Sequence, residues 1–429
     1  MPLPPFPSLQ HNLQTDVLII GGGICGLLCA YMLAQEGVNY ALVESERICG
    51  KTSGNTTAKV TFQHGLIYSK LLNTVGLEKT QMYLEANRRA LVQYRSICEN
   101  CDCEFESKDA IVYSLDSVAK LEQEYNAYET LGISAEFIKT LPLPFPSVGG
   151  LRVRDQGQIH PLKLAAFLAA KLNIYENTPV LAYDGRSVIT PHANITASHI
   201  IVTTHFPIFN KHGAYFLKMY QHRSYVTALN NVPVFPEMYI DEAEDGLSFR
   251  SYQNHLLVGG GAHRTGKKGG NWQALTAFSQ AYFPGANERY RWAAQDCMTL
   301  DGIPYIGEYS RSTPNLYTAT GFQKWGFSTS MAAASILCDM IQGRKSEIAE
   351  VFSPSRTVMR PQLFRNIAES GIQFLTPTVP RCPHLGCVLK WNRHEHSWDC
   401  PCHGSRFTAQ GRVLESPANK KAFRIQRNQ

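Results

Sequence analysis

The sequence predicts an α/β protein in which a parallel sheet is joined to an antiparallel sheet and followed by a small C-terminal domain. Three observations support this prediction. An apolar run enters a glycine-rich turn at DVLIIGGGICG, residues 16–26. Apolar and polar residues alternate in the middle of the chain, as in half-buried strands. Two short loops, CPHLGC at residues 382–387 and CPCHGS at residues 400–405, lie near the C-terminal end.

The composition is that of a folded chain with two or three domains. Of 429 residues, 44% are hydrophobic and 18% are charged. No apolar run reaches the roughly 18 residues of a membrane helix. The proline-rich leader, residues 1–13, has neither the basic start nor the apolar core of a secretory signal. We therefore expect a cytoplasmic protein without a membrane span.

The net charge of +6 comes from scattered basic residues without a long basic run. This distribution argues against nucleic acid as a partner. A basic surface is nevertheless suited to an acidic protein partner.

The first motif predicts a site for a dinucleotide. The apolar run at residues 16–20 is typical of a buried parallel strand, and GGGICG, a helix-like run and a second strand ending at Glu44 follow. Gly21 permits a tight turn, Gly23 lets the backbone approach a pyrophosphate, and Gly26 lets the helix pack closely on the strand. The helix N-terminus then faces the phosphates, and Glu44 accepts hydrogen bonds from ribose hydroxyls.

A second strand–glycine–helix unit occurs at LYTATGFQKWG, residues 316–326, followed by the helix-like FSTSMAAASILCDMIQG. Its helix N-terminus could face another anionic group, which suits the edge of a flavin ring where negative charge builds up on reduction. The glycine motif alone does not distinguish FAD from NAD.

The middle of the chain predicts a substrate-binding sheet. The runs YQHRSYVTAL and GLSFRSYQNHLLVGGGAHRTGK alternate apolar with polar residues and fit an antiparallel sheet with one face over a pocket. An arginine or tyrosine there could hold a substrate carboxylate by charge-assisted hydrogen bonds. The alternative is that these side chains are surface or structural polar groups. The candidate pocket residues are His64, Arg223, Tyr225, Arg250, His263 and Lys324.

The stretches DVLIIGGGICG, KTSGNTTAKVTFQH, QDCMTLDGIPYIG and TATGFQKWGFSTSMAAASIL, in this order, resemble the FAD-dependent oxidoreductases of the glycine/D-amino-acid oxidase (DadA-like) family. The resemblance covers about residues 14–352 and is strongest to the subgroup that carries a C-terminal Rieske domain. It implies a Rossmann-like FAD-binding domain with a D-amino-acid oxidase-like antiparallel substrate domain. FAD binding would use about residues 14–80, 150–210 and 295–352, and the substrate sheet about 81–149 and 211–294.

The same resemblance implies a set of FAD contacts, and five of the candidate pocket residues are in addition candidate catalytic residues. The FAD contacts are Gly21, Gly23, Gly26, Glu44, Thr57, Ala58, Val180, Gly321, Lys324, Trp325 and Gly326. The candidate catalytic residues are His64, Arg223, Tyr225, Arg250 and His263. Cys297 lies where some family members attach flavin covalently, although the local spacing does not match.

Twelve cysteines are present, four of them within 21 residues at the C-terminal end. Clustered cysteines in a large chain without a signal peptide bind metal more often than they form disulfides. The CENCDC stretch at residues 98–103 also has a spacing that could hold zinc or a cluster, but no further ligand lies nearby in sequence. We interpret these three as ordinary thiols.

The C-terminal loops have the spacing C-x-H-x15-C-x-x-H and resemble the Rieske [2Fe–2S] motif. The resemblance implies that the C-terminal domain is a small all-β Rieske-type domain. The resemblance assigns Cys382 and Cys400 to one iron and His384 and His403 to the other. It assigns the remaining pair, Cys387 and Cys402, to a disulfide that joins the two loops. A zinc site is the rival reading, but zinc fingers usually present paired C-x2–4-C and H-x3–5-H motifs, and six potential ligands exceed one zinc.

The tail departs from the Rieske pattern in two ways. The segment at 353–429 leaves only about 30 residues before the first ligand, so we expect a shortened domain whose cluster is exposed, labile or covered by the flavin domain. Ser405 can donate a hydrogen bond to a cluster sulfur, but residue 407 is Phe, where high-potential members have a tyrosine donor. Fewer donors disfavour the reduced cluster, so we expect a potential below that of the respiratory type.

A flavin accepts two electrons, and a Rieske cluster passes one electron at a time. A chain with both centres is therefore predicted to convert a two-electron oxidation into two one-electron transfers. The leading hypothesis is oxidation of an amine or amino acid at a C–N bond, with electrons leaving through the cluster to an external acceptor. In one alternative, the same two centres transfer electrons in the opposite direction, and the protein is a reductase that receives electrons from a reduced carrier. In another, the protein is a redox sensor without turnover. The sequence does not indicate the oligomeric state.

Overall fold

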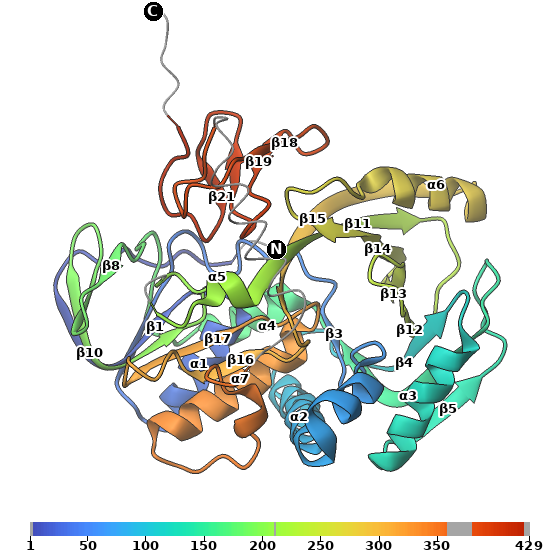
Figure 1. Ribbon diagram of the computed structural model, residues 1–429, viewed down its shortest axis with the longest axis horizontal. Coiled ribbons are helices and arrows are strands. Elements are labelled where there is room, and N and C mark those ends of the chain that lie inside the picture. The colour runs from blue at the N-terminus through green and yellow to red at the C-terminus, as the bar shows by residue number, and fades with distance from the viewer. Residues whose placement is uncertain (1–2, 210–211, 358–379, 424–429) are drawn as a thin grey trace, which may run out of the picture.

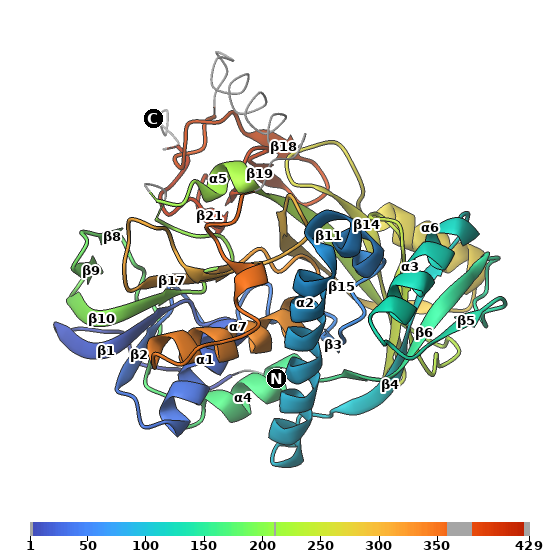
Figure 2. The same ribbon diagram turned by 60° about the horizontal axis from the view of Figure 1, so that its bottom comes forward.

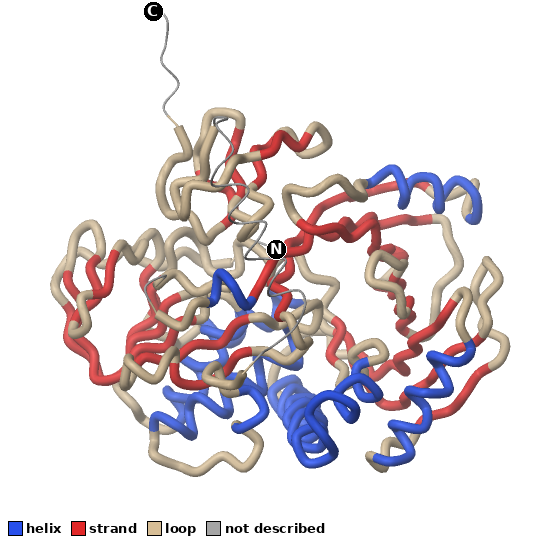
Figure 3. The backbone as a smooth tube through the Cα atoms, viewed as in Figure 1, coloured by secondary structure: helices blue, strands red, loops and turns tan. Residues whose placement is uncertain are grey.

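The computed structural model describes residues 3–209, 212–357 and 380–423. Three sheets organise this part of the chain, and Figure 1 shows the small C-terminal sheet above the two larger ones. In Figure 3 strands predominate on both sides of a central group of helices. Most of the segment that joins the C-terminal sheet to the rest falls outside the described residues, as does the predicted shortening at its start.

The first sheet has eight strands and forms the nucleotide-binding half of the molecule. Its order is β16-β17-β10-β1-β2-β7, and β9 pairs with both β10 and β8. Strand β1 is parallel to β10 and β2, and β10 is parallel to β17. The strands are β1 (Leu13–Ile20), β2 (Tyr40–Val43), β7 (Ile174–Tyr175), β8 (Ala182–Tyr183), β9 (Ser187–Ile189), β10 (Asn194–Val202), β16 (Tyr305–Glu308) and β17 (Leu316–Thr320).

The central strands of this sheet are buried on both faces, and apolar helices cover one of the two faces. In Figure 2, α1 (Ile24–Gln35), α4 (Pro161–Ala169) and α7 (Gly326–Ile341) lie together against it. Eight residues of α1 and eleven of α7 are buried. The parallel strands β1 and β10 therefore end side by side, and Gly21 and Thr203 follow them at one edge of the sheet.

The second sheet has nine strands, in the order β15-β11-β14-β13-β12-β4-β6-β3, with β5 beside β6. Strand β3, strand β6 from residue 150 and strand β15 from residue 295 fall in ranges that the sequence analysis gave to FAD binding. The strands are β3 (Lys59–Val60), β4 (Glu106–Ser114), β5 (Ala135–Ile138), β6 (Gly149–Gln158), β11 (Met219–Asn230), β12 (Met238–Asp241), β13 (Ser248–Tyr252), β14 (His255–Arg264) and β15 (Asn287–Thr299). The helices beside it are α2 (Ile67–Glu99), α3 (Val118–Thr130), α5 (Tyr215–Lys218) and α6 (Trp272–Tyr282).

The third sheet is the core of the C-terminal domain. Four short antiparallel strands pair in chain order: β18 (Lys390–Asn392), β19 (Ser397–Asp399), β20 (Arg406–Thr408) and β21 (Val413–Glu415). The four cysteines of this region are buried together with Leu389, Phe407 and Ala418. No helix among the described residues is both long and apolar enough to cross a membrane.

Candidate functional site

A cavity of about 950 Å³ lies between the first two sheets and is closed on one side by the C-terminal domain. The chain after β1, the N-terminus of α7, and strands β11, β14 and β15 line it. The segment at 413–419 of the C-terminal domain completes the wall, and the Lys51 ammonium donates to the Leu414 carbonyl across this junction at 3.0 Å.

The glycine-rich turn forms one end of the cavity. Gly21 has a φ of +115°, and a Cβ there would lie 2.9 Å from the Thr203 carbonyl oxygen. A Cβ on Gly23 would lie 3.1 Å from Ser53 Oγ, which accepts a hydrogen bond from the Ile24 amide at 3.0 Å. Because neither glycine carries a Cβ, a ligand can approach the backbone of this turn closely. The N-terminus of α1 opens on the same cavity.

Most of the predicted FAD contacts meet on this wall. Gly26 does not line the cavity, because it packs against the Gly21 carbonyl and Thr203, in the close helix–strand contact expected of it. Ala58 is buried behind the wall. The predicted contacts that line the cavity are Gly21, Gly23, Glu44, Thr57, Val180, Gly321, Lys324, Trp325 and Gly326.

Two of the five predicted catalytic residues line the cavity. The His64 ring stacks on Trp325 with ring centroids 4.7 Å apart. Its nitrogens lie 2.6 Å from Tyr83 Oη and 2.9 Å from Ser328 Oγ, and burial lowers its pKa to about 3. This neutral, fully engaged imidazole holds Trp325 in place and has no free nitrogen for a substrate proton. Tyr225 lines the cavity, but its hydroxyl donates to Glu395.

The other three predicted catalytic residues do not line the cavity. Arg223 forms a two-pronged ion pair with Glu395 of the C-terminal domain, with Nη2 at 2.6 Å and Nε at 3.0 Å. Arg250 is buried, and its Nη1 lies 3.5 Å from the Ala58 and Ile159 carbonyl oxygens. His263 stacks on the Tyr225 ring with centroids 5.8 Å apart. The structure thus places none of these three side chains on the cavity wall.

Arg250 nevertheless influences a cavity residue from behind the wall. The Lys59 ammonium lines the cavity and lies 3.4 Å from Thr57 Oγ1. Burial, with repulsion from Arg250, lowers the pKa of Lys59 to about 7. At neutral pH this amine therefore exists in both protonation states.

A polar group that the sequence reasoning did not single out lies on the cavity face of β11 and β15. Asp296 lines the cavity, and the Ser224 hydroxyl donates to its carboxylate at 3.4 Å. Burial raises the pKa of Asp296 to about 6, against the opposing charge of Lys324. Asp296 lies in the QDCMTLDG stretch, where the resemblance identified the segment but not the residue.

The two C-terminal loops have the same backbone form. The Gly386 amide donates to the Cys382 carbonyl, and the Gly404 amide donates to the Cys400 carbonyl. Both glycines have a positive φ, 76° and 77°. The loops therefore hold Cys382 beside Cys400, and a hydrogen bond with Cys400, together with burial, raises the pKa of the Cys382 thiol.

The predicted histidine ligands also lie side by side, with ring centroids 5.0 Å apart. Both ring nitrogens of His403 are buried and have no hydrogen-bond partner among the described residues. Burial lowers the pKa of His403 to about 3, which keeps its imidazole neutral, as a metal ligand must be. An enclosed polar atom without a partner and adjacent thiols fit a bound metal cluster.

The structure does not show the predicted disulfide. All twelve cysteines are free in this structure, including Cys387 and Cys402. Their Sγ atoms and that of Cys400 lie within 4.8 Å of one another. The predicted partners are therefore adjacent, and Cys400 lies close to both of them and to Cys382. The thiols at residues 98–103 are free as well.

The C-terminal domain is attached to the back of the cavity wall. The Gln221 side-chain amide donates to the His403 carbonyl, and the Gln295 amide donates to the Gly404 carbonyl, both at 2.8 Å. The Phe206 ring lies 6.3 Å from the rings of both His384 and His403. The Phe216 ring of α5 lies 5.9 Å from the His403 ring, so the two histidines face the first sheet and α5. Figures 1 and 2 show the C-terminal domain close to α5.

The fold and these two sites define a dinucleotide-dependent oxidoreductase that carries an iron–sulfur domain. Comparison of the chain with known protein families identifies its family. Residues 16–340 match the family model described as FAD dependent oxidoreductase, and residues 373–426 match the Rieske [2Fe-2S] domain. The chain belongs to this FAD-dependent oxidoreductase family, carries a C-terminal Rieske domain and uses FAD and a [2Fe–2S] cluster.

Individual relatives agree with this assignment. The chain is 34% identical to the Rieske 2Fe-2S iron-sulfur protein YhfW of Bacillus subtilis, over 99% of this chain and 96% of the relative. It is 23% identical to the gamma-glutamylputrescine oxidoreductase of Escherichia coli, over 79% of this chain and 86% of the relative. The glycine oxidase structure from Geobacillus kaustophilus superposes with a TM-score of 0.69 at 19% identity, covering 81% of this chain and 100% of that one.

Proposed function

We propose that this enzyme oxidises an amine or amino acid at a C–N bond and delivers the electrons to an external acceptor through its C-terminal domain. When bound, FAD supplies two-electron chemistry and the [2Fe–2S] cluster supplies one-electron chemistry. The predicted ligands, Cys382, His384, Cys400 and His403, would hold the cluster.

The observation that carries this proposal is the shared wall between the two sites. His205 lines the cavity, and the next residue, Phe206, packs against both histidines of the C-terminal loops. Gln221 lies between the same two sites, because it forms a hydrogen bond with His205 and also donates to the His403 carbonyl. One layer of side chains thus separates the cavity from the predicted cluster ligands, which favours exchange of electrons within a single chain.

The cavity also offers groups suited to an amino-acid-like substrate. Asp296 supplies a carboxylate, and its pKa of about 6 leaves it mostly ionised at pH 7 and able to accept a proton from an ammonium group. Lys324 supplies a nearby positive charge for a carboxylate. The names of two relatives, a glycine oxidase and a gamma-glutamylputrescine oxidoreductase, support the same substrate class.

The test is anaerobic mixing of the purified protein with glycine, other amino acids, simple amines and γ-glutamylputrescine. We expect at least one of them to bleach the flavin absorbance and then to produce the electron paramagnetic resonance signal of a reduced Rieske cluster. The Asp296→Asn protein should bleach much more slowly with the same compound while keeping its flavin and iron content.

Two results would contradict the proposal. If no amine or amino acid bleaches the flavin but a reduced one-electron carrier bleaches it, electrons flow from the carrier through the cluster to the flavin. If neither reduces the flavin, the protein is a sensor without turnover.

A further inference from the structure

The outer surface of the C-terminal domain exposes charge of one sign. In the described part of this domain, residues 380–423, every exposed charged side chain is basic: Lys390, Arg393, Arg412, Lys420 and Lys421. None of these five has an ion pair among the described residues. The acidic residues face inward, where Glu395 and Asp399 pair with Arg406 at 2.9 and 3.0 Å, and Glu415 lies 3.8 Å from Arg223.

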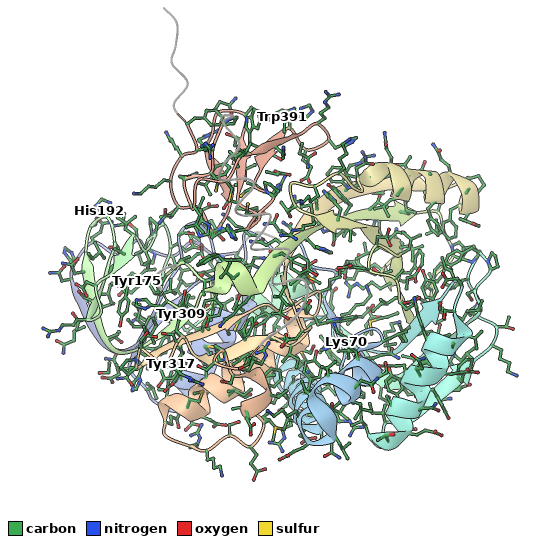
Figure 4. The ribbon with its side chains drawn as sticks, viewed as in Figure 1. Lys70, Tyr175, His192, Tyr309, Tyr317 and Trp391 are labelled. Atoms are coloured by element: carbon green, nitrogen blue, oxygen red, sulfur yellow. The ribbon has the colours of Figure 1, made fainter. Side chains whose placement is uncertain are left out.

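An aromatic row connects the buried cysteines with this surface. Trp398 packs against the core that contains the four cysteines. Its ring lies 5.1 Å from Trp391 and 6.2 Å from Phe423. Trp391 is 38% exposed, and Figure 4 labels it at the outer end of the C-terminal domain, away from the cavity. Large exposed aromatic residues are typical of protein interfaces.

Basic residues adjoin the far end of this row. The Ala422 amide donates to the Gly411 carbonyl, which places residues 420–423 beside the turn that holds Arg412. A Cβ on Gly411 would lie 3.0 Å from the Phe423 carbonyl oxygen. We name this surface the Trp391 patch: Trp391, Trp398, Phe423, Arg412, Lys420 and Lys421.

We infer that the Trp391 patch is the docking site of an acidic protein that carries one electron at a time. This inference rests on the proposed function, because it places the exit of the electrons. The histidine side of the loops is occupied by Phe206, Gln221 and Gln295, and His403 is only 1% exposed. The aromatic row offers a second side, and its positive border attracts a partner of negative charge.

The electron count of the exchange is simple. One electron leaves the reduced cluster and enters the oxidised centre of the carrier, and no bond or proton changes place. Two encounters with the carrier therefore restore the protein after each two-electron oxidation of substrate.

The experiment uses two forms of one probe, native horse-heart cytochrome c, which is basic, and the same cytochrome after lysine succinylation, which makes it acidic. The full-length protein is reduced with dithionite, freed of the reagent without oxygen, and mixed with either form. This procedure needs no substrate, so its outcome does not depend on the amine that the enzyme oxidises. Binding of the oxidised protein to each immobilised cytochrome gives a readout without electron transfer.

We expect the acidic cytochrome to bind and to be reduced at least tenfold faster than the basic one at low salt, with the difference lost as salt rises. The double variant Arg412→Glu and Lys421→Glu should remove that preference in both readouts. The variant Arg186→Glu changes an exposed residue of the β8–β9 hairpin in the first sheet, makes the same kind of charge change and should have no effect. Trp391→Ala should slow reduction at saturating cytochrome, and Trp391→Phe should restore most of the rate.

Equal rates with the two cytochromes, or an unchanged preference in the double variant, would overturn the inference and place the exit on another face. An equal effect of Arg186→Glu would show that only net charge matters and would overturn it as well.

Discussion

The two faces of strands β11 and β15 show how one sheet can serve two redox sites. On one face Ser224 and Asp296 point toward the cavity. On the other, Gln221, Arg223 and Gln295 hold the C-terminal domain. Because successive side chains of a strand point to opposite faces, neighbouring residues are divided between substrate chemistry and domain docking. The comparison teaches that a residue next to the pocket in sequence can be turned fully away from it.

Substitutions on the two faces should impair different steps. The largest expected effect is on the C-terminal domain, where loss of the cluster should stop electron delivery. Cys400→Ser should abolish iron and sulfide binding, because Cys400 lies against Cys382, Cys387 and Cys402. Electron delivery to cytochrome should then be lost, while substrate should still bleach the flavin. Metal analysis and flavin absorbance check both parts. Cys101→Ser, which changes a half-buried thiol at the end of α2, should keep the full iron content.

On the cavity face, Asp296→Asn should lower kcat/KM by about 10²–10⁴-fold, as loss of a proton acceptor does. In the unmodified protein kcat/KM should fall as the pH drops through about 6, because Asp296 then becomes protonated and cannot accept a proton. The Asp296→Asn variant should not show this fall of kcat/KM at acid pH. Steady-state kinetics across pH 5–8 with an identified substrate checks the pH dependence. The same fall in the variant would assign it to another group.

The contacts between the docking face and the C-terminal domain should also contribute to the stability of the protein. Glu395→Ala should destabilise the docked domain by about 3–5 kcal/mol, because it leaves Arg223 and Arg406 buried without their shared carboxylate. Calorimetry would measure the loss. Glu85→Ala removes the carboxylate of an exposed ion pair with Arg89 and should cost less than about 1 kcal/mol. Equal effects of the two changes would contradict a buried docking contact.

The smallest expected effect is on the cluster potential. Ser405 forms a hydrogen bond with Cys382, so Ser405→Ala should lower the midpoint potential by about 60–130 mV, the equivalent of one hydrogen bond of about 1.5–3 kcal/mol to a charged group. Phe407→Tyr should shift it in the opposite direction. A redox titration followed by circular dichroism measures both. Thr408→Val, one residue beyond Phe407, should leave the potential unchanged.

The local motifs were readable from the sequence because their physics is local. The positive φ of Gly21 and the open N-terminus of α1 follow from a turn of a few residues. The C-terminal loops likewise bring Cys382 and Cys400 together as their spacing suggests. The assignment of the four cluster ligands stays a prediction, as do the exact domain boundaries.

The substrate pocket was not readable in the same way. Arg223 looked like a carboxylate ligand, but its partner Glu395 is 172 residues away in the sequence, and only the docked domain reveals it. Asp296 escaped attention because a single acid in a strand has no distinctive spacing. The direction in which each side chain points depends on sheet register, and here His222 pairs with Asp296 while Arg223 pairs with Gln295. Such long-range pairings are not encoded in a local pattern.

The most direct test of the shared wall is rapid-mixing and freeze-quench paramagnetic resonance after anaerobic addition of a substrate that bleaches the flavin. We predict that the signal of the reduced cluster rises at a rate that does not depend on protein concentration, because the electron moves within one chain. A rate proportional to protein concentration, or a bleached flavin with no cluster signal, would contradict the account.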